Sequence, residues 1–203
     1  MATAPEITTN PQPRVSRRPF VARLLELVPE ALVVTGLGAP SYDVFAAGDR
    51  DENFYLWGAM GGAVSVGLGL ALAQPERSVL VITGDGEMLM GIGSLATVGV
   101  QQPANLSIVV LDNGHYGETG MQPSHTSQGV DLAGIARASG IADSSKILDP
   151  AEVGRLAARV AARSGPLFAQ VLIDTDEPPR ALPSRDGVHV KNRFRAALGL
   201  EPF

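Results

Sequence analysis

Two side chains of this sequence offer oxygen atoms at what we predict to be one edge of a β-sheet. Asp85 closely follows an apolar run at residues 78–83, and Asn113 closely follows a second one at residues 106–111. Both runs are short, continuous and rich in β-branched residues, which is typical of parallel strands covered on both faces. The carboxyl ends of parallel strands meet at one edge of a sheet, where ligands bind in such folds. We therefore expect the chemistry of this protein at that edge.

The turn around Asp85 has the composition of a site for a phosphate and a divalent cation. Gly84 and Gly86 bracket the aspartate, and glycine lets a ligand approach the backbone closely. Residues 87–100 are apolar and long enough for a crossover helix, whose free N–H groups at its start favour a phosphate. Because a bare carboxylate repels a phosphate, we expect a cation between them. The oxygen ligands of Asp85, Asn113 and the phosphate suit Mg²⁺.

The order of apolar segments predicts an α/β fold, in which a three-layer, doubly wound, mainly parallel sheet carries helices on both faces. We expect strands at residues 31–36, 53–58, 78–83, 106–111 and 165–174, and helices at residues 20–28, 42–47, 58–74, 87–100, 129–139 and 151–163. Residues 1–19 read as a flexible leader and residues 20–175 as one domain. Residues 176–203 form a proline-rich C-terminal extension with a helix near residues 191–198.

Composition restricts the class of protein. With 203 residues the chain has the size of one ordinary domain, and its 45% hydrophobic and 18% charged residues predict that some apolar surface is buried against another chain. The net charge of −5, without a basic run interleaved with aromatic residues, argues against nucleic acid as a partner. The absence of cysteine excludes disulfides and thiolate metal sites, and is compatible with the cytoplasm, where we expect the protein.

No segment reads as a targeting or membrane-spanning sequence. The first 18 residues lack the apolar centre of a signal peptide. Glycines, Gln74 and Pro75 interrupt the longest apolar stretch, so we expect no membrane span.

The spacing of the polar residues resembles the signature of the thiamine diphosphate-dependent enzymes. In that signature a Gly-Asp-Gly triplet is followed by about two dozen residues and an asparagine; here residues 87–112 separate Gly86 from Asn113. The resemblance runs from about Trp57 through the segment DNGHYGETGMQPSHT, and it is strongest to the β subunit of sulfopyruvate decarboxylases and the matching half of phosphonopyruvate decarboxylases. Residues 20–175 have the length and order of the diphosphate-binding domain of that superfamily.

The resemblance implies a role for each matching residue. The carbonyl of Gly58 would accept a hydrogen bond from the cofactor's pyrimidine amino group, and Met60 would be the apolar wedge that bends the cofactor. Taken without the resemblance, Met60 reads as a core gap-filler. Mg²⁺ would be held by Asp85, Asn113 and the backbone carbonyl of His115. The implied cofactor-binding residues are Gly58, Met60, Gly84, Asp85, Gly86, Glu87, Asn113, His115, Tyr116 and Gly117, and the implied catalytic residues are Gly58, Met60, His115 and Glu118.

The segment after Asn113 is expected to cover the cofactor and to contact the substrate. Its polar candidates are Tyr116, Glu118, Gln122, His125 and Thr126. We expect Asp112 to hold this loop in place in preference to binding the cation. Met121 stands where related segments usually have glycine, and no arginine lies in the predicted lid, so the sequence leaves the recognition of an acidic substrate group open.

The implied activity is that of a 2-oxo acid decarboxylase or lyase that uses thiamine diphosphate and Mg²⁺. In this superfamily a glutamate on a separate pyrimidine-binding domain activates the cofactor, and we find no second domain in the sequence. We therefore expect an α subunit that carries this glutamate, in an α₂β₂ assembly. The alternatives are a carboligase of the acetolactate synthase type and a noncatalytic cofactor-binding subunit. A ferredoxin-linked oxidoreductase is disfavoured because the chain has no cysteine for an iron–sulfur cluster.

Two further patterns have weaker functional interpretations. The segment GIGSLA at residues 91–96 fits a loose dinucleotide-binding fingerprint, but its glycines lie inside the predicted helix, whereas the fingerprint requires them directly after a strand. Arg155, Arg159 and Arg163 recur at helical spacing, and we interpret them as a solvated stripe.

Overall fold

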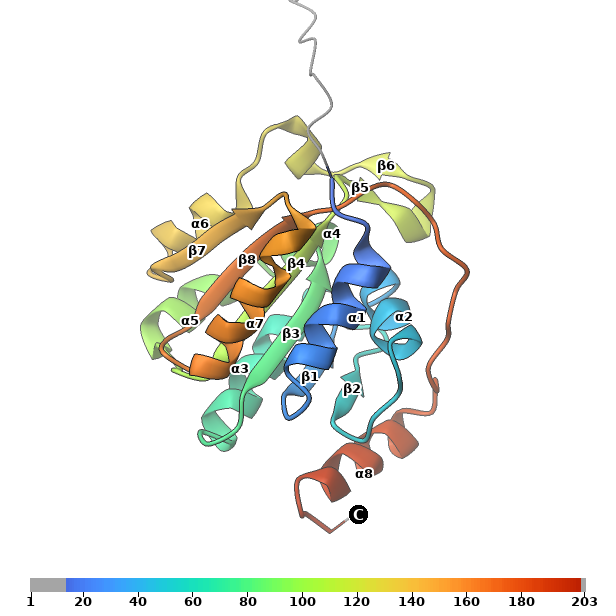
Figure 1. Cartoon of the computed structure of the whole chain (residues 1–203), viewed down its shortest axis with the longest axis vertical. Helices are drawn as coiled ribbons and strands as arrows, with labels where there is room; N and C mark the ends of the chain where they lie inside the picture. The colour runs from blue at the N-terminus through green and yellow to red at the C-terminus, as the bar shows by residue number, and fades with distance from the viewer. Residues whose placement is uncertain (1–13, 202–203) are drawn as a thin grey trace, which may run out of the picture.

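The computed structural model describes residues 14–201, and Figure 1 shows a central sheet with helices on both faces. Every pair of neighbouring strands in this six-stranded sheet is parallel. In spatial order the strands are β2 (Asn53–Tyr55), β1 (Leu32–Thr35), β3 (Val79–Gly84), β4 (Leu106–Asp112), β8 (Leu167–Leu172) and β7 (Asp143–Ile147). The predicted three-layer α/β fold is confirmed.

Two hydrophobic cores lie on opposite faces of the sheet. One face is covered by α1 (Arg17–Leu27), α2 (Ala39–Ala46) and α7 (Val153–Ala162), and the other by α3 (Ala63–Ala73), α5 (Ser94–Gln101) and α6 (Leu132–Ala138). Strand β3 supplies Leu80 and Ile82 to the first core and Val79 and Val81 to the second. Because both faces of β3 are buried, its sequence is a continuous apolar run without polar alternation.

The strand order has a topological switch point between β1 and β3. Strand β2 pairs with one edge of β1, and the next strand in the sequence, β3, pairs with the opposite edge of β1. Ligands in open parallel sheets bind outside the carboxyl ends of the strands at such a reversal. Gly36 follows β1 and Asp85 follows β3, so both residues lie at this switch point.

The helix expected at residues 87–100 is two shorter helices, α4 (Asp85–Met90) and α5. The break coincides with a close approach between two backbones. A Cβ atom on Gly91 would lie 2.1 Å from the carbonyl oxygen of Gly61. The helix expected from Gly58 begins only at Ala63, because the preceding residues form a loop that packs against this break.

The sequence did not predict the edge strand β7 or a small hairpin near the site. The segment DSSKI of β7 is polar because β7 pairs only with β8, and within it only Ser144 and Ile147 are buried. The hairpin joins β5 (His115–Tyr116) to β6 (Gln122–Pro123). A sequence this short and polar carries no strand periodicity.

The start of the folded domain lies earlier than expected. Val15 is fully buried and forms a parallel bridge with Ile173, and α1 begins at Arg17. Residues 14–19 are therefore part of the fold, which corrects the boundary of the leader at residue 19. Residues 1–13 of the expected leader lie outside the described residues.

The C-terminal extension lies on the domain itself. Residues 174–186, which we call the C-terminal strap, run from the end of β8 past the β5–β6 hairpin and down one side of the molecule (Figure 1). The strap ends at α8 (Gly187–Ala197), which packs on the edge strand β2 through Phe194 and Phe54, with ring centroids 5.4 Å apart. The expected terminal helix is confirmed, with an earlier start. No helix among residues 14–201 has the length and hydropathy to span a membrane.

Candidate active site

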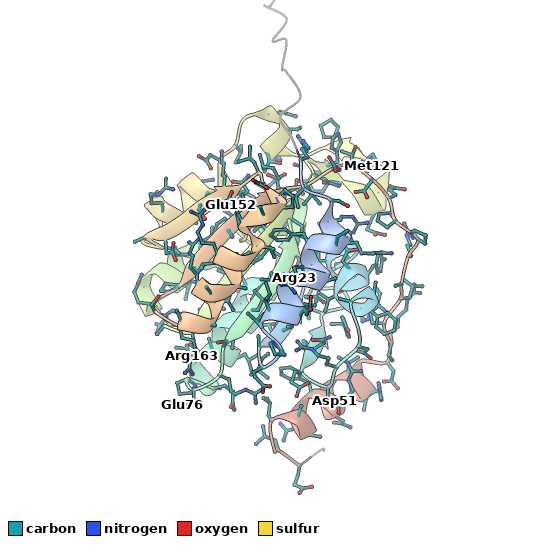
Figure 2. All side chains as sticks on the ribbon, viewed as in Figure 1. Arg23, Asp51, Glu76, Met121, Glu152 and Arg163 are labelled. Atoms are coloured by element: carbon teal, nitrogen blue, oxygen red, sulfur yellow. The ribbon has the colours of Figure 1, made fainter. Side chains whose placement is uncertain are left out.

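A cavity of about 370 Å³ lies at the carboxyl edge of the sheet. Its walls come from the turn after β3, the loop after β4, the start of α2 and the C-terminal strap. Figure 2 shows Met121, which lines the cavity, at the end of the molecule opposite Glu76. The structure brings together most of the predicted site residues in this wall: Met60, Gly84, Asp85, Gly86, Glu87, Asn113, His115, Tyr116, Gly117 and Glu118.

Asp85 is a buried carboxylate with no basic partner among the described residues. Only 2% of the residue is exposed. Burial, followed by the nearby carboxylate of Asp112, raises the pKa of Asp85 to about 6. The hydroxyl groups of Ser124 and Thr126 both contact Oδ2 of Asp85, Thr126 at 3.2 Å, and act against this shift. No ion pair found among residues 14–201 includes Asp85 or Asp112. Two neighbouring buried carboxylates of this kind fit a bound cation.

Asp112 holds the loop, as the sequence predicts. Its Oδ1 accepts hydrogen bonds from the amide of Gly114 at 2.9 Å and the hydroxyl of Thr126 at 2.7 Å. Its Oδ2 accepts a hydrogen bond from Nε2 of Gln170 at 2.6 Å. Both oxygens are therefore used inside the protein. The negative charge of Asp112 acts on the site through its proximity to Asp85.

The other two expected metal ligands lie together on the next strand end. Asn113 and His115 line the same cavity as Asp85. The side-chain Oδ1 of Asn113 accepts a hydrogen bond from the amide of His115 at 2.9 Å, which fixes the turn after β4. Within the described residues no three His, Cys, Asp or Glu side chains form a metal cluster. A cation here requires amide and backbone oxygens beside Asp85, which is a donor set suited to Mg²⁺.

Glu87 connects the turn after β3 to the loop after β1. It is 4% exposed, and its Oε2 accepts a hydrogen bond from the amide of Leu37 at 2.9 Å. A Cβ atom on Gly36 would lie 1.7 Å from this oxygen, so only glycine fits there. Burial raises the pKa of the Glu87 carboxyl. The Glu87 carboxylate thus forms part of the cavity wall between the end of β1 and the end of β3.

The absence of a side chain at Gly86 leaves room for the ring of Tyr116. A Cβ atom at Gly86 would lie 2.5 Å from the ring of Tyr116. Tyr116 belongs to the β5–β6 hairpin, whose amides and carbonyls pair it with Gln122. The hairpin therefore packs directly on the turn that bears Asp85.

Met60 and Gly58 occupy the loop before α3. The Met60 residue is 39% exposed and lines the cavity, so it is not the core gap-filler of the alternative interpretation. Gly58 is not among the residues lining the cavity and has a positive φ of 75°, a conformation that favours glycine. The loop candidates Gln122 and His125 also lie outside the cavity wall, whereas Thr126 contacts Asp85.

Sequence reasoning missed the residues that come from distant segments. Arg17 and Tyr42 line the cavity from α1 and α2, and Arg180 lines it from the C-terminal strap. Arg17 is 6% exposed and donates a hydrogen bond to the buried Asp43 at 2.6 Å. Arg180 pairs with Glu118 at 3.3 Å. No local motif marks these side chains, because folding alone brings them to the site.

The charged side chains of Glu118 and Arg180 affect the pKa of the neighbouring Tyr42. Burial raises the pKa of the Tyr42 hydroxyl, and the carboxylate of Glu118 raises it further, while Arg180 acts in the opposite direction. The guanidinium of Arg180 lies 5.8 Å from the centre of the Tyr42 ring. The cavity thus has an acidic end at Asp85 and a wall with arginine side chains at Arg17 and Arg180.

Comparison with known proteins supports a cofactor site at this edge. Residues 44–171 match the family described as thiamine pyrophosphate enzyme, C-terminal TPP binding domain. The chain is 43% identical over 123 residues to the sulfopyruvate decarboxylase subunit beta of Methanocaldococcus jannaschii, which covers 60% of this chain and 65% of that protein. It is 39% identical over 195 residues to the phosphonopyruvate decarboxylase of Streptomyces viridochromogenes, which covers 93% of this chain and 48% of that protein. The chain thus matches less than two thirds of the length of both relatives.

The fold has close counterparts among solved structures. Benzoylformate decarboxylase from Polynucleobacter necessarius superposes with a TM-score of 0.68 over 87% of this chain and 36% of its own, at 22% sequence identity. At this level of identity the likeness concerns the fold alone.

Proposed function

The chain belongs to the thiamine pyrophosphate enzymes through their C-terminal cofactor-binding domain, and from that premise we propose that it is the β-type subunit of a 2-oxo acid decarboxylase. The observation that carries the proposal is the buried carboxylate of Asp85, which shares one cavity with Asn113, His115 and Met60. One relative is named sulfopyruvate decarboxylase subunit beta and another phosphonopyruvate decarboxylase, and these names support the reaction class.

The chain's own oxygen atoms would hold Mg²⁺ and, through it, the diphosphate. Asp85 offers a carboxylate oxygen, Asn113 a side-chain amide oxygen and His115 its backbone carbonyl. Ser124 and Thr126 restrain Asp85 from the opposite loop, so that its carboxylate keeps one orientation. The excess negative charge of Asp85 and Asp112 would attract the cation, which in turn compensates the charge of the diphosphate.

When bound, thiamine diphosphate supplies the electron sink that lets a 2-oxo acid lose carbon dioxide. The role of this chain at the reacting end is to position the cofactor and to handle protons. Met60 would support the cofactor from the loop before α3. Glu118, at the cavity wall beside Tyr42, is placed to hold or deliver a proton near the substrate. The hairpin bearing Tyr116, which lines the cavity, would restrict the access of water to it.

We further propose that a second chain completes the site. The name "subunit beta" of the archaeal relative supports this proposal. The partner would carry the pyrimidine-binding domain and its activating glutamate, in an α₂β₂ assembly in the cytoplasm.

The proposal is tested by carbon dioxide release from 3-sulfopyruvate in the presence of thiamine diphosphate and Mg²⁺. We expect turnover by the chain assembled with its partner subunit, and little or none by the chain alone. Robust turnover by the isolated chain contradicts the divided site. An assembled complex that decarboxylates no 2-oxo acid contradicts the proposed activity.

The proposed metal site is tested separately, by measuring the binding of the cofactor. In the assembled protein, Asp85→Asn should abolish Mg²⁺-dependent binding of thiamine diphosphate in calorimetry, because the buried carboxylate is the charged ligand. Asp51→Asn is the matched control, since the Asp51 side chain is 68% exposed and remote from the cavity wall. Unchanged affinity in Asp85→Asn would refute the assigned metal site.

A further inference from the structure

The C-terminal strap carries a guanidinium into the wall of the cavity. Asp176, Glu177, Pro178, Pro179 and Arg180 all line it, although the strap follows the last strand of the sheet and has no helix or strand of its own. The backbone next to Arg180 is fixed, because Nη1 of Arg18 donates a hydrogen bond to the carbonyl of Pro179 at 2.8 Å.

The strap is held at its other end as well. The indole Nε1 of Trp57 donates a hydrogen bond to the carbonyl of Ser184 at 2.7 Å, and the guanidinium of Arg185 lies 5.4 Å from the centre of the Trp57 ring. Helix α8 then anchors the chain on β2. Arg180 therefore projects from a segment whose backbone is attached on both sides of it.

The two arginines of the cavity wall differ in how firmly they are engaged. Arg17 is buried and bound to Asp43, whose carboxylate also accepts a hydrogen bond from Arg18 at 3.0 Å. Such a buried pair is a fixed part of the structure, because breaking it leaves an uncompensated buried charge. Arg17 is thus not available to exchange its partner for a ligand.

Arg180 is engaged much more weakly. Its nitrogen is 3.3 Å from Oε2 of Glu118, and the two side chains are 62% and 38% exposed. Solvent-exposed ion pairs of this kind contribute little free energy. An anion that enters the cavity can therefore replace Glu118 as the partner of Arg180 with little loss of stability. A planar guanidinium also binds the oxygens of a sulfonate, phosphonate or carboxylate through two parallel hydrogen bonds.

We propose that Arg180 is the specificity-determining residue for a second anionic group on the 2-oxo acid substrate, delivered to the active site by the C-terminal strap. This inference rests on the proposed decarboxylase function. It explains how the chain recognises an acidic substituent although the loop after β4 contains no arginine. The position of Arg180 beside Tyr42 and Glu118 puts the recognised group next to the reacting end of the cavity.

The test compares two substrates in the assembled enzyme loaded with thiamine diphosphate and Mg²⁺. One is 3-sulfopyruvate, which has the second anionic group, and the other is pyruvate, which lacks it. In Arg180→Gln we expect kcat/KM for 3-sulfopyruvate to fall about 10- to 100-fold, mainly through KM, because a hydrogen-bonded charge is lost. The kcat/KM for pyruvate should stay within about twofold, and Arg180→Lys should retain part of the preference.

Arg155→Gln is the matched control, since Arg155 is about as exposed as Arg180 (67% against 62%), also pairs with a glutamate, and lies outside the cavity wall. It should leave both substrates unaffected. The affinity for thiamine diphosphate, measured by calorimetry, should be the same in Arg180→Gln and in the unmodified protein. A loss of that affinity would assign Arg180 to the diphosphate and overturn the inference.

Two kinetic results also overturn it: an equal change for both substrates in Arg180→Gln, and no change for either. An unmodified enzyme that shows no preference for 3-sulfopyruvate over pyruvate has the same consequence. These outcomes differ from the failure of the proposed function, in which the unmodified assembled enzyme decarboxylates neither substrate nor any other 2-oxo acid.

Discussion

The hydroxyl of Ser124 donates a hydrogen bond to Oδ2 of Asp85 and so joins the loop after β6 to the end of β3, 39 residues earlier in the chain. Ser124 is fully buried, and its amide also donates a hydrogen bond to the carbonyl of Gly114 at 2.8 Å. The residue that would hold the cation is therefore tied to the loop that covers the cavity. Occupancy of the metal site and order of this loop should change together.

The raised pKa of Asp85 gives the metal-free protein a defined dependence on pH. The folded-state pKa of about 6 lies above the ordinary value of 3.8, so the native state binds more protons than the unfolded state between these two values. The stability of the metal-free protein should rise as the pH falls from about 7 toward 4, by roughly 2 to 3 kcal/mol from this group alone. Urea unfolding in EDTA measures this change.

The variant Asp85→Asn isolates the contribution of this carboxylate. In EDTA at neutral pH it should be more stable than the unmodified protein, because it removes an uncompensated buried charge. The difference should shrink as the pH falls through 6 and vanish below about 3, well under the unfolded-state pKa of 3.8, where Asp85 is protonated in both states. Parallel pH profiles for the two proteins would contradict this electrostatic account.

Thr126 is predicted to stabilise the loop through its hydroxyl group. That group contacts Oδ1 of Asp112 at 2.7 Å and Oδ2 of Asp85 at 3.2 Å. Thr126→Val should lower the free energy of unfolding by about 1 to 3 kcal/mol, because it removes a hydrogen-bond donor from buried carboxylates. Hydrogen exchange of the amides in residues 114–130 should accelerate.

The conservative variant Thr126→Ser retains the hydroxyl and should restore most of the protection. If Thr126→Val exchanges as slowly as the unmodified protein, the bridge between the two carboxylates does not order the loop. Thr119→Val provides a comparison within the same loop, since the hydroxyl of Thr119 bonds the exposed Gln122 instead of a buried group.

The proximity of Asp85 and Asn113 in one cavity wall was predictable because a single physical rule determines it. Each residue follows a continuous apolar run, and the carboxyl ends of parallel strands meet at one edge. The neighbouring Gly86 and Glu87 followed from the same turn. These predictions depended on local sequence and on the direction of strands, which the apolar pattern specifies without tertiary detail.

Other features depend on contacts that no local pattern records. Arg180 reaches the cavity because the strap is anchored by Arg18 and Trp57, which belong to distant elements. The helix break at Gly91 reflects its contact with Gly61. Strand β7 was missed because a polar edge strand lacks the apolar run that identified the central strands.

The contact between Gly86 and Tyr116 predicts that a single methyl group will disturb the site. In Gly86→Ala the added Cβ would lie 2.5 Å from the Tyr116 ring, so the ring must move. We expect a loss of about 1 to 3 kcal/mol in stability from this overpacking, and weaker binding of thiamine diphosphate in calorimetry. Gly154→Ala is the control: Gly154 lies in α7 with no atom within 4 Å of the added Cβ, and alanine there should stabilise the helix by about 0.5 to 1 kcal/mol. Equal cofactor affinity in both variants would show that the hairpin tolerates the displacement of Tyr116.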